Sequence, residues 1–130
     1  MTGLDTNILV RYLTKDDAAQ SPKAAEILRS LTDDEPGFVS VVVLAETAWV
    51  LESVYRFPQN AVVTALVALV QAYGLVVQED ACVVVALEAA KKGDGAFADA
   101  LIGALALRMG CARVLTFDKR AERLPGFELI

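Results

Sequence analysis

Short and long hydrophobic segments alternate along the chain. The short ones predict strands at Thr2–Asp5, Phe38–Val39, Leu75–Val77, Arg113–Phe117 and Phe127–Ile130. The longer ones predict helices over Thr6–Leu13, from Ser21 to the acidic turn at Asp33, and over Ser40–Tyr55, Pro58–Tyr73, Asp80–Lys92 and Phe97–Met109, with a helical turn at Asp118–Glu122. Strands that alternate with helices predict a small parallel sheet with helices on both faces.

Polar residues at the ends of these segments support the helix assignments. Thr6 and Ser40 are typical helix N-caps, and Pro22 suits a first helical turn. The valines after Ser40 alone could suggest a strand, but the length of that segment favours a helix. Lys92 precedes Gly93, as expected at a helix C-terminus.

Length and hydropathy indicate one soluble domain over residues 1–130. The chain has 130 residues, of which 55% are hydrophobic, and its mean hydropathy is +0.47. No apolar run reaches the roughly 18 residues that a membrane span needs. The first residues carry neither a basic segment nor a cleavage site, so we expect no signal peptide and a cytoplasmic location.

Cysteine spacing and net charge narrow the function classes. Cys82 and Cys111 match no metal-binding spacing, and their apolar neighbours predict buried structural thiols. The net charge of −5 weighs against a nucleic-acid-binding protein unless a metal site neutralises several acids. The surplus of apolar residues favours a partner or a homodimer interface.

Four acids stand isolated in apolar segments, namely Asp5, Glu46, Asp99 and Asp118. Asp5 and Asp118 each follow a predicted strand, and Asp99 begins a predicted helix, so all three can meet at the carboxyl ends of the strands. The chain has no histidine. Acids that share one pocket repel one another unless a hard cation such as Mg²⁺ or Mn²⁺ lies between them.

Each acid also has a simpler interpretation. Asp5 could cap the helix that follows, since Asp, Thr and Asn all favour helix starts, or bind a metal with Thr6 or Asn7 holding the loop. Asp118 could cap the turn after it, or join the metal site with the hydroxyl of Thr116 pointing into the same crevice.

The other acids leave similar alternatives. Glu46 is the only charge between Val41 and Leu51, and it could form an ion pair with an arginine rather than bind a metal. Asp99 could simply interact with the dipole of its helix. Asp94, in a glycine-flanked loop, is the weakest candidate and fits an exposed turn.

The segments around these acids resemble PIN-domain ribonucleases, specifically the VapC-type toxins of toxin–antitoxin pairs. The resemblance rests on GLDTNILVRYL, SVVVLAETAWVLE, FADALIGALA and VLTFDKRAERLPG, which occur in this order over almost the whole chain. It implies a PIN-like three-layer α/β/α sandwich with a small central parallel sheet. The segment Phe57–Lys92 adds little to it.

The resemblance also implies a function. The family's acidic metal site corresponds to Asp5, Glu46 and Asp99, and its less uniform fourth acid to Asp118. It implies a Mg²⁺- or Mn²⁺-dependent endoribonuclease that cleaves RNA, is inhibited by a VapB-type antitoxin and forms a homodimer. Thr6 and Thr116 correspond to the family's supporting polar residues.

Basic residues lie beside the acids. Arg11 lies one helix from Asp5, and Lys119, Arg120 and Arg123 follow Asp118. They could contact RNA phosphates or form an ordinary solvated face. An antitoxin could use the same region and insert a basic side chain among the acids.

Two other classes compete with this hypothesis. A Mg²⁺-dependent phosphatase or a receiver domain also places aspartates at strand ends, but a receiver needs an acidic pair after its first strand, where Asp5 stands alone. The other alternative is a PIN fold that has lost its activity and serves as an interaction module.

Overall fold

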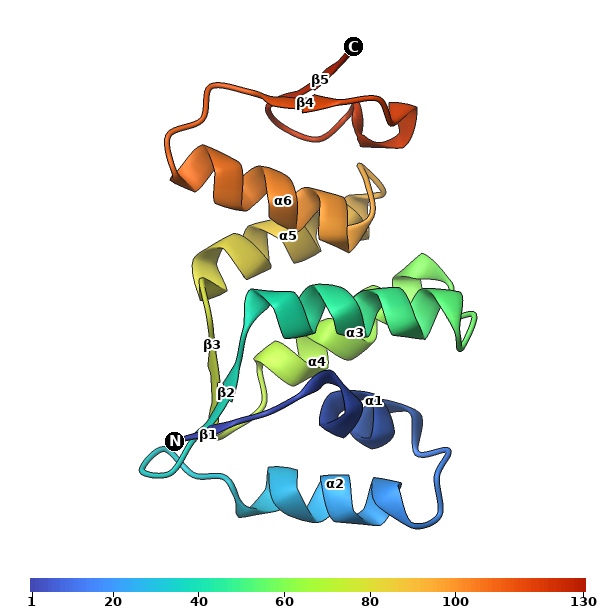
Figure 1. Ribbon diagram of the computed structural model, residues 1–130, viewed down its shortest axis with the longest axis vertical. Coiled ribbons are helices and arrows are strands. Elements are labelled where there is room, and N and C mark those ends of the chain that lie inside the picture. Colours follow the sequence, from blue (N-terminus) through green and yellow to red (C-terminus); the bar gives the residue numbers. More distant parts are fainter.

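Parallel strands alternate with helices in the computed structural model, which describes residues 1–130 (Figure 1). The strands are β1 (Thr2–Gly3), β2 (Gly37–Val39), β3 (Leu75–Val77), β4 (Val114–Thr116) and β5 (Phe127–Leu129). The helices are α1 (Thr6–Thr14), α2 (Gln20–Ser30), α3 (Val41–Ser53), α4 (Gln59–Val70), α5 (Asp80–Lys92), α6 (Phe97–Arg108) and the 3₁₀ helix η1 (Lys119–Ala121). The α/β class with a parallel sheet is therefore confirmed.

The strands form two separate sheets, whereas the sequence pattern suggested one. The first has the order β1-β2-β3 and the second contains β4 and β5, and every pair is parallel. Gly3 aligns with Phe38 in the first sheet, and Leu115 aligns with Glu128 in the second. As a result, β1 and β4 each lie at the edge of a sheet.

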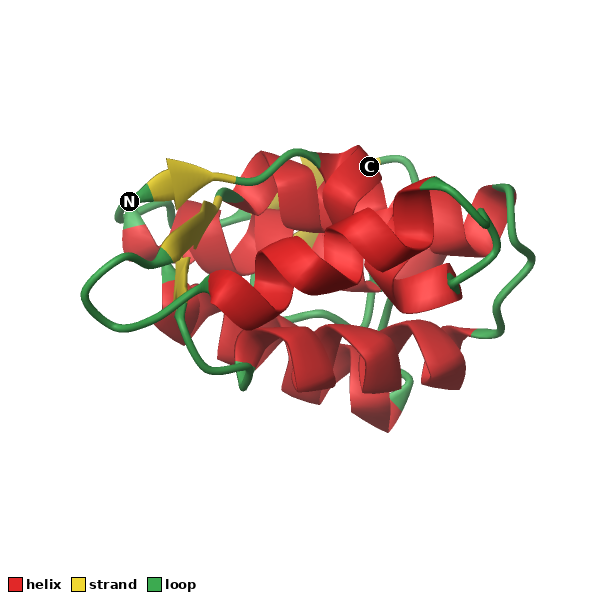
Figure 2. Ribbon diagram, turned by 90° about the horizontal axis from the view of Figure 1, so that it is seen from below, coloured by secondary structure: helices red, strands yellow, loops and turns green.

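The helices separate the two sheets. Helices α5 and α6 pack against each other and stack on the layer of α3 and α4 (Figure 1). Strands β4 and β5 lie beyond α6 at one end of the long axis, and α1 and α2 lie toward the other end. Seen from below, the β1–β2–β3 strands gather near the N-terminus while helices fill most of the view (Figure 2).

One hydrophobic core runs through the helical layers. Its fully buried side chains include Leu9, Leu44, Leu51 and Leu66. The valine-rich segment after Ser40 is helical, as expected, and the Ser40 hydroxyl accepts the N–H of Val43 at 3.2 Å. This cap fixes where α3 begins, directly after β2.

A glycine in α6 allows β5 to lie close against that helix. A Cβ atom added to Gly103 would stand 2.6 Å from Cε2 of Phe127. Any larger side chain would therefore push the ring away. The contact ties the β4–β5 sheet to α6.

The structure tests the expectations for the two cysteines and for membrane-spanning segments. Cys82 is buried in the core as expected, but Cys111 is exposed, because it lies in the loop after the end of α6. The expectation for Cys111 is therefore wrong. No helix combines the length and apolarity that crossing a bilayer requires.

Candidate acidic site

Thr6 connects the first pair of acids, Asp5 and Glu46. Asp5 follows β1 and caps α1, with Oδ1 accepting the N–H of Thr6 at 2.8 Å. The hydroxyl of Thr6 donates a hydrogen bond to Oε1 of Glu46, which lies on α3. Thr6 itself is only 5% exposed, so its position is fixed by packing. One buried residue thus holds carboxylates from two separate elements.

Asp5 and Glu46 are both exposed, although apolar residues surround them in the sequence. In α3 the helical period turns Leu44, Ala48 and Leu51 into the core and leaves Glu46 facing outward. The partner of Glu46 is the Thr6 hydroxyl, and no arginine pairs with it.

The second pair consists of Asp99 and Asp118. Asp99 lies in the first turn of α6 and is partly buried. Burial raises the pKa of Asp99, and the nearby carboxylate of Asp118 raises it further, while the positive charge of Arg120 opposes both. The two acids are thus close enough to affect each other's charge.

Asp118 is held by its own turn. Its Oδ1 accepts the backbone N–H of Arg120 at 2.9 Å, and its Oδ2 lies 3.0 Å from the Arg120 guanidinium. These hydrogen bonds lower the pKa of Asp118 below its ordinary value. The hydroxyl of Thr116 accepts the N–H of Asp118 at 3.0 Å. The interpretation of Asp118 as a cap is therefore correct in geometry, and an ion pair accompanies it.

The two pairs do not converge within one chain. No three acidic or cysteine side chains lie close enough together to hold a metal ion. Carboxylate and hydroxyl oxygens are the ligands that Mg²⁺ prefers, so the donor chemistry suits this ion, but their placement in a single chain does not. The reason is the division of the sheet, since Asp5 follows β1 in one sheet and Asp118 follows β4 in the other.

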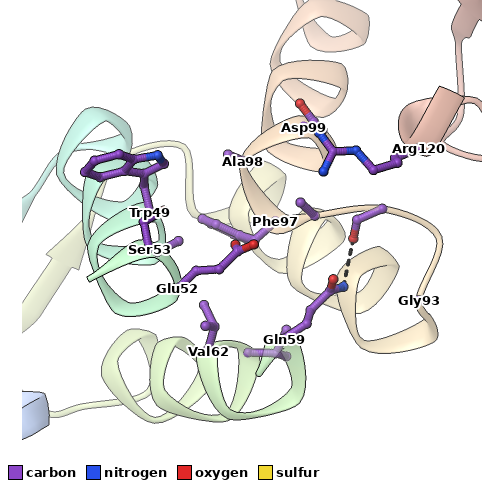
Figure 3. Close-up of a pocket in the computed structure, with 14 residues that line it drawn as sticks. Trp49, Glu52, Ser53, Gln59, Val62, Gly93, Phe97, Ala98, Asp99 and Arg120 are labelled. Carbon is purple, nitrogen blue, oxygen red and sulfur yellow. Dashed lines mark hydrogen bonds between the residues drawn. The ribbon is translucent and has the colours of Figure 1, made fainter. Parts of the chain in front are cut away.

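A cavity of about 460 Å³ adjoins Asp99, between α3, α4 and the start of α6 (Figure 3). Arg120 extends beside Asp99, and Glu52 reaches into the space from α3. The indole of Trp49 lines the same cavity and is 62% exposed. Neither Trp49 nor Glu52 was predicted from the sequence to belong to a site. Their spacing of three residues on one helix face was the available signal.

A glutamine fixes the loop at the floor of this cavity. Nε2 of Gln59 donates to the carbonyl oxygens of Ala90 at 2.9 Å and Gly95 at 3.0 Å, the second of which is drawn in Figure 3. These bonds position the residues that lead into α6 and therefore Asp99.

The remaining candidates differ in how strongly they are held. Arg11 donates to Gln20 at 2.8 Å and to the Tyr55 hydroxyl at 3.0 Å, and it forms an ion pair with Asp16 at 3.2 Å. This network holds Arg11 against neighbouring elements.

Other candidates lie freely at the surface. Lys119 and Asn7 are exposed, and Lys119 forms no ion pair. Asp94, in its loop, pairs with Arg123 at 3.5 Å, but its side chain is only 29% exposed, less than the exposed turn expected from the sequence.

The fold is of the α/β class. Two of its isolated acids, Asp5 and Asp118, follow parallel strands, and Asp99 lies in the first turn of a helix. The model of the PIN domain family matches residues 4–126, so the chain belongs to the PIN domain family, a family of nucleases. The search of curated proteins found no match.

Proposed function

We propose that the protein is an endoribonuclease that depends on Mg²⁺ or Mn²⁺ and hydrolyses phosphodiester bonds of RNA. The observation that carries this proposal is the match to a nuclease family over residues 4–126, a span that contains all four isolated acids. The resemblance to VapC-type toxins adds the finer role of a toxin that acts in the cytoplasm and is inhibited by a VapB-type antitoxin.

Each acid has a part in this proposal. Asp5, Glu46, Asp99 and Asp118 would supply the oxygen ligands for the cation, which requires the two pairs, separate in this structure, to approach each other when the cation binds. Thr6 positions Glu46 through its hydroxyl. Thr116 accepts the N–H of Asp118 and so orients the segment that carries this acid.

Substrate binding is assigned to the cationic and aromatic side chains around the cavity. The side chain of Arg120 is 89% exposed and lies beside Asp99, where it can meet an RNA phosphate. Lys119 is exposed next to it. The indole of Trp49 offers a surface on which an unpaired base can stack. Arg11 is a weaker candidate, since its guanidinium is already engaged.

The antitoxin would act on the same charged region. An acidic site attracts a basic side chain, and one inserted among the carboxylates would replace the cation they need. The inhibitor proposed is therefore a protein segment with an exposed arginine or lysine.

The test is a cleavage assay with purified protein that has been separated from any bound antitoxin by denaturation and refolding. We expect it to cut RNA with Mg²⁺ or Mn²⁺, to stop in EDTA and to recover when the metal is restored. Asp99→Asn should lose most of this activity with either metal. Wild-type protein that leaves RNA intact with either metal would contradict the proposal and favour a PIN fold used for interaction alone. Equal cleavage by Asp99→Asn would contradict the proposed site.

A further inference from the structure

The cavity beside Asp99 contains a carboxylate that has no partner within the chain. Glu52 extends into this cavity from the last turn of α3 (Figure 3), and none of the chain's ion pairs includes it. The dipole of a helix disfavours a negative charge near its C-terminus, so this placement does not stabilise α3. A carboxylate also repels RNA phosphates. At an RNA-binding cavity, Glu52 is therefore useful as an acceptor for the N–H groups of a base.

Gln59 adds a second acceptor to the cavity, from the start of α4. Its Nε2 donates to the carbonyl oxygens of Ala90 and Gly95. Because both partners accept hydrogen bonds, the nitrogen of the amide must lie on their side. This leaves Oε1 of Gln59 free to accept from a ligand. Glu52 and Gln59 thus offer acceptors, and a matching ligand has to supply donors.

The rest of this lining is largely apolar or aromatic. The indole of Trp49 is 62% exposed and lies three residues before Glu52, on the same face of α3. Phe97, Val62 and Val63 also line the cavity and are buried. Its volume of about 460 Å³ lies within the roughly 300–1,000 Å³ of small-molecule sites. A flat ring with apolar faces and a polar edge suits such a cavity.

The four RNA bases offer different edges to a carboxylate. On the Watson–Crick edge of guanine, N1–H and the 2-amino group are adjacent donors, which match the two oxygens of a carboxylate. Adenine and cytosine each place one amino donor beside a ring nitrogen that accepts, and uracil places N3–H between two carbonyl oxygens. With any of these three bases, the second carboxylate oxygen would face another acceptor.

We propose that this cavity binds one unpaired guanine of the RNA, with Glu52 accepting from its N1–H and 2-amino groups and Trp49 stacking on its ring. The inference rests on the proposed function for the choice of RNA as the ligand. The oxygen of Gln59 is available to the remaining hydrogen of the 2-amino group. The stacked ring buries its apolar faces, while the edge supplies the selectivity.

Arg120 connects this guanine site with the acids. It lines the cavity beside Asp99 (Figure 3). Asp118 raises the pKa of Arg120 most, and the charges of Asp99 and Glu52 raise it further, so the guanidinium lies within the electrostatic reach of all three acids. It can contact the phosphate next to the bound guanine. Cleavage is therefore expected at or beside a guanosine.

Tryptophan fluorescence tests the stacking, because Trp49 is the only tryptophan of the chain. Short single-stranded oligouridines that carry one guanosine, adenosine, cytidine or inosine are titrated in EDTA, which removes the proposed metal. We expect the guanosine RNA to quench the fluorescence and to bind about 10-fold or more tightly than the adenosine and cytidine RNAs. Inosine keeps N1–H but lacks the 2-amino group, so its RNA should bind with intermediate affinity.

Glu52→Gln tests which group selects the base. An amide offers one donor and one acceptor, which match the edge of adenine rather than that of guanine. We expect the preference for guanosine to disappear and adenosine to bind at least as tightly, as measured by fluorescence anisotropy of labelled RNA. Glu26→Gln is the matched control, because Glu26 is an exposed acid on α2, outside the cavity. It should retain the preference for guanosine.

The outcomes separate the two proposals. Equal affinity for all the RNAs, no binding, or unchanged Trp49 fluorescence on binding would overturn the guanine site. A preference for guanosine that survives in Glu52→Gln would overturn the role of Glu52. Wild-type protein that selects guanosine but leaves RNA intact with Mg²⁺ or Mn²⁺ would contradict the proposed function and support the guanine site. Cleavage at sites unrelated to guanosine would support the proposed function and overturn the guanine site.

Discussion

The two acid pairs are held by different kinds of neighbour. Asp5 and Glu46 share a neutral residue, Thr6, which binds one carboxylate through its backbone and the other through its hydroxyl. Asp99 and Asp118 share a cation, Arg120, which forms an ion pair with Asp118 and offsets the charge beside Asp99. Hydrogen bonds to Thr6 therefore fix the positions of the first two carboxylates, whereas the charge of Arg120 controls the protonation of the second two.

This difference predicts separate responses to substitution. A change at Thr6 should move a carboxylate without altering its charge. A change at Arg120 should alter the protonation of the acids with little effect on their position.

The largest effect is expected from removing one carboxylate. Asp99→Asn should reduce kcat/KM for RNA by more than the roughly 100-fold reached at residues that only support metal ligands. Asp94→Asn is the matched control, because Asp94 is also partly buried but pairs with Arg123 and with none of the four acids, so it should keep near wild-type activity. Initial rates on a labelled RNA measure both, and equal losses would remove Asp99 from the site.

Loss of the Thr6 hydroxyl should have an intermediate effect. Thr6→Val keeps the shape of the buried side chain but frees Glu46, so kcat/KM should fall about 10- to 100-fold. Thr6→Ser retains the hydroxyl and should restore most of the activity. If Thr6→Val has the same kcat/KM as the wild type, the hydrogen bond from Thr6 to Glu46 is not needed for activity. The proposed role of Thr6 in the first pair would then be wrong.

Removal of Arg120 should act on protonation. Because Arg120 opposes the raised pKa of Asp99, Arg120→Ala should raise that pKa further, and the pKa of Asp118 should rise toward its ordinary value. Both acids would then take up protons at a higher pH than in the wild type. Carboxyl-carbon NMR titration of metal-free protein measures the shift. Lys119→Ala is the control, and an identical shift there would show that general surface charge is responsible.

The smallest effect concerns the stability of α3, which carries Glu46. The buried hydroxyl of Thr47 has no hydrogen-bond partner. Thr47→Val should therefore raise the free energy of unfolding by about 1 kcal/mol. Thr64 is exposed, and its hydroxyl donates a hydrogen bond to the carbonyl oxygen of Asn60 in the same helix. Thr64→Val should therefore change the free energy of unfolding little. Urea unfolding measures both, and destabilisation by Thr47→Val would show that the hydroxyl is satisfied.

Local signals predicted the helices well. Ser40 marked the start of α3, and Gly93 ended α5. Each of these depends on neighbours within a few residues, so the sequence alone contains the information. The N-cap of α1 is Asp5 and not Thr6, which was wrongly expected there and whose hydroxyl bonds Glu46 instead.

The division of the sheet could not be read in the same way. Whether β4 pairs with β1 or only with β5 depends on contacts between distant segments, and their apolar patterns are alike. For the same reason the sequence pattern predicted Asp5, Asp99 and Asp118 at one edge, whereas the chain holds Asp5 apart from the other two. Trp49 and Glu52 could not be predicted as site residues, because only folding brings them beside Asp99 in one cavity.

If the two acid pairs act as one site, their contributions to catalysis depend on each other, and a double-variant cycle measures that dependence. Kinetic constants for RNA cleavage are measured for Asp5→Asn, Asp99→Asn and the protein carrying both. Groups that work as a unit are strongly non-additive, so the double variant should lose little more than either single variant. Losses that multiply, or a single variant that keeps wild-type kcat/KM, would show that the two pairs work independently.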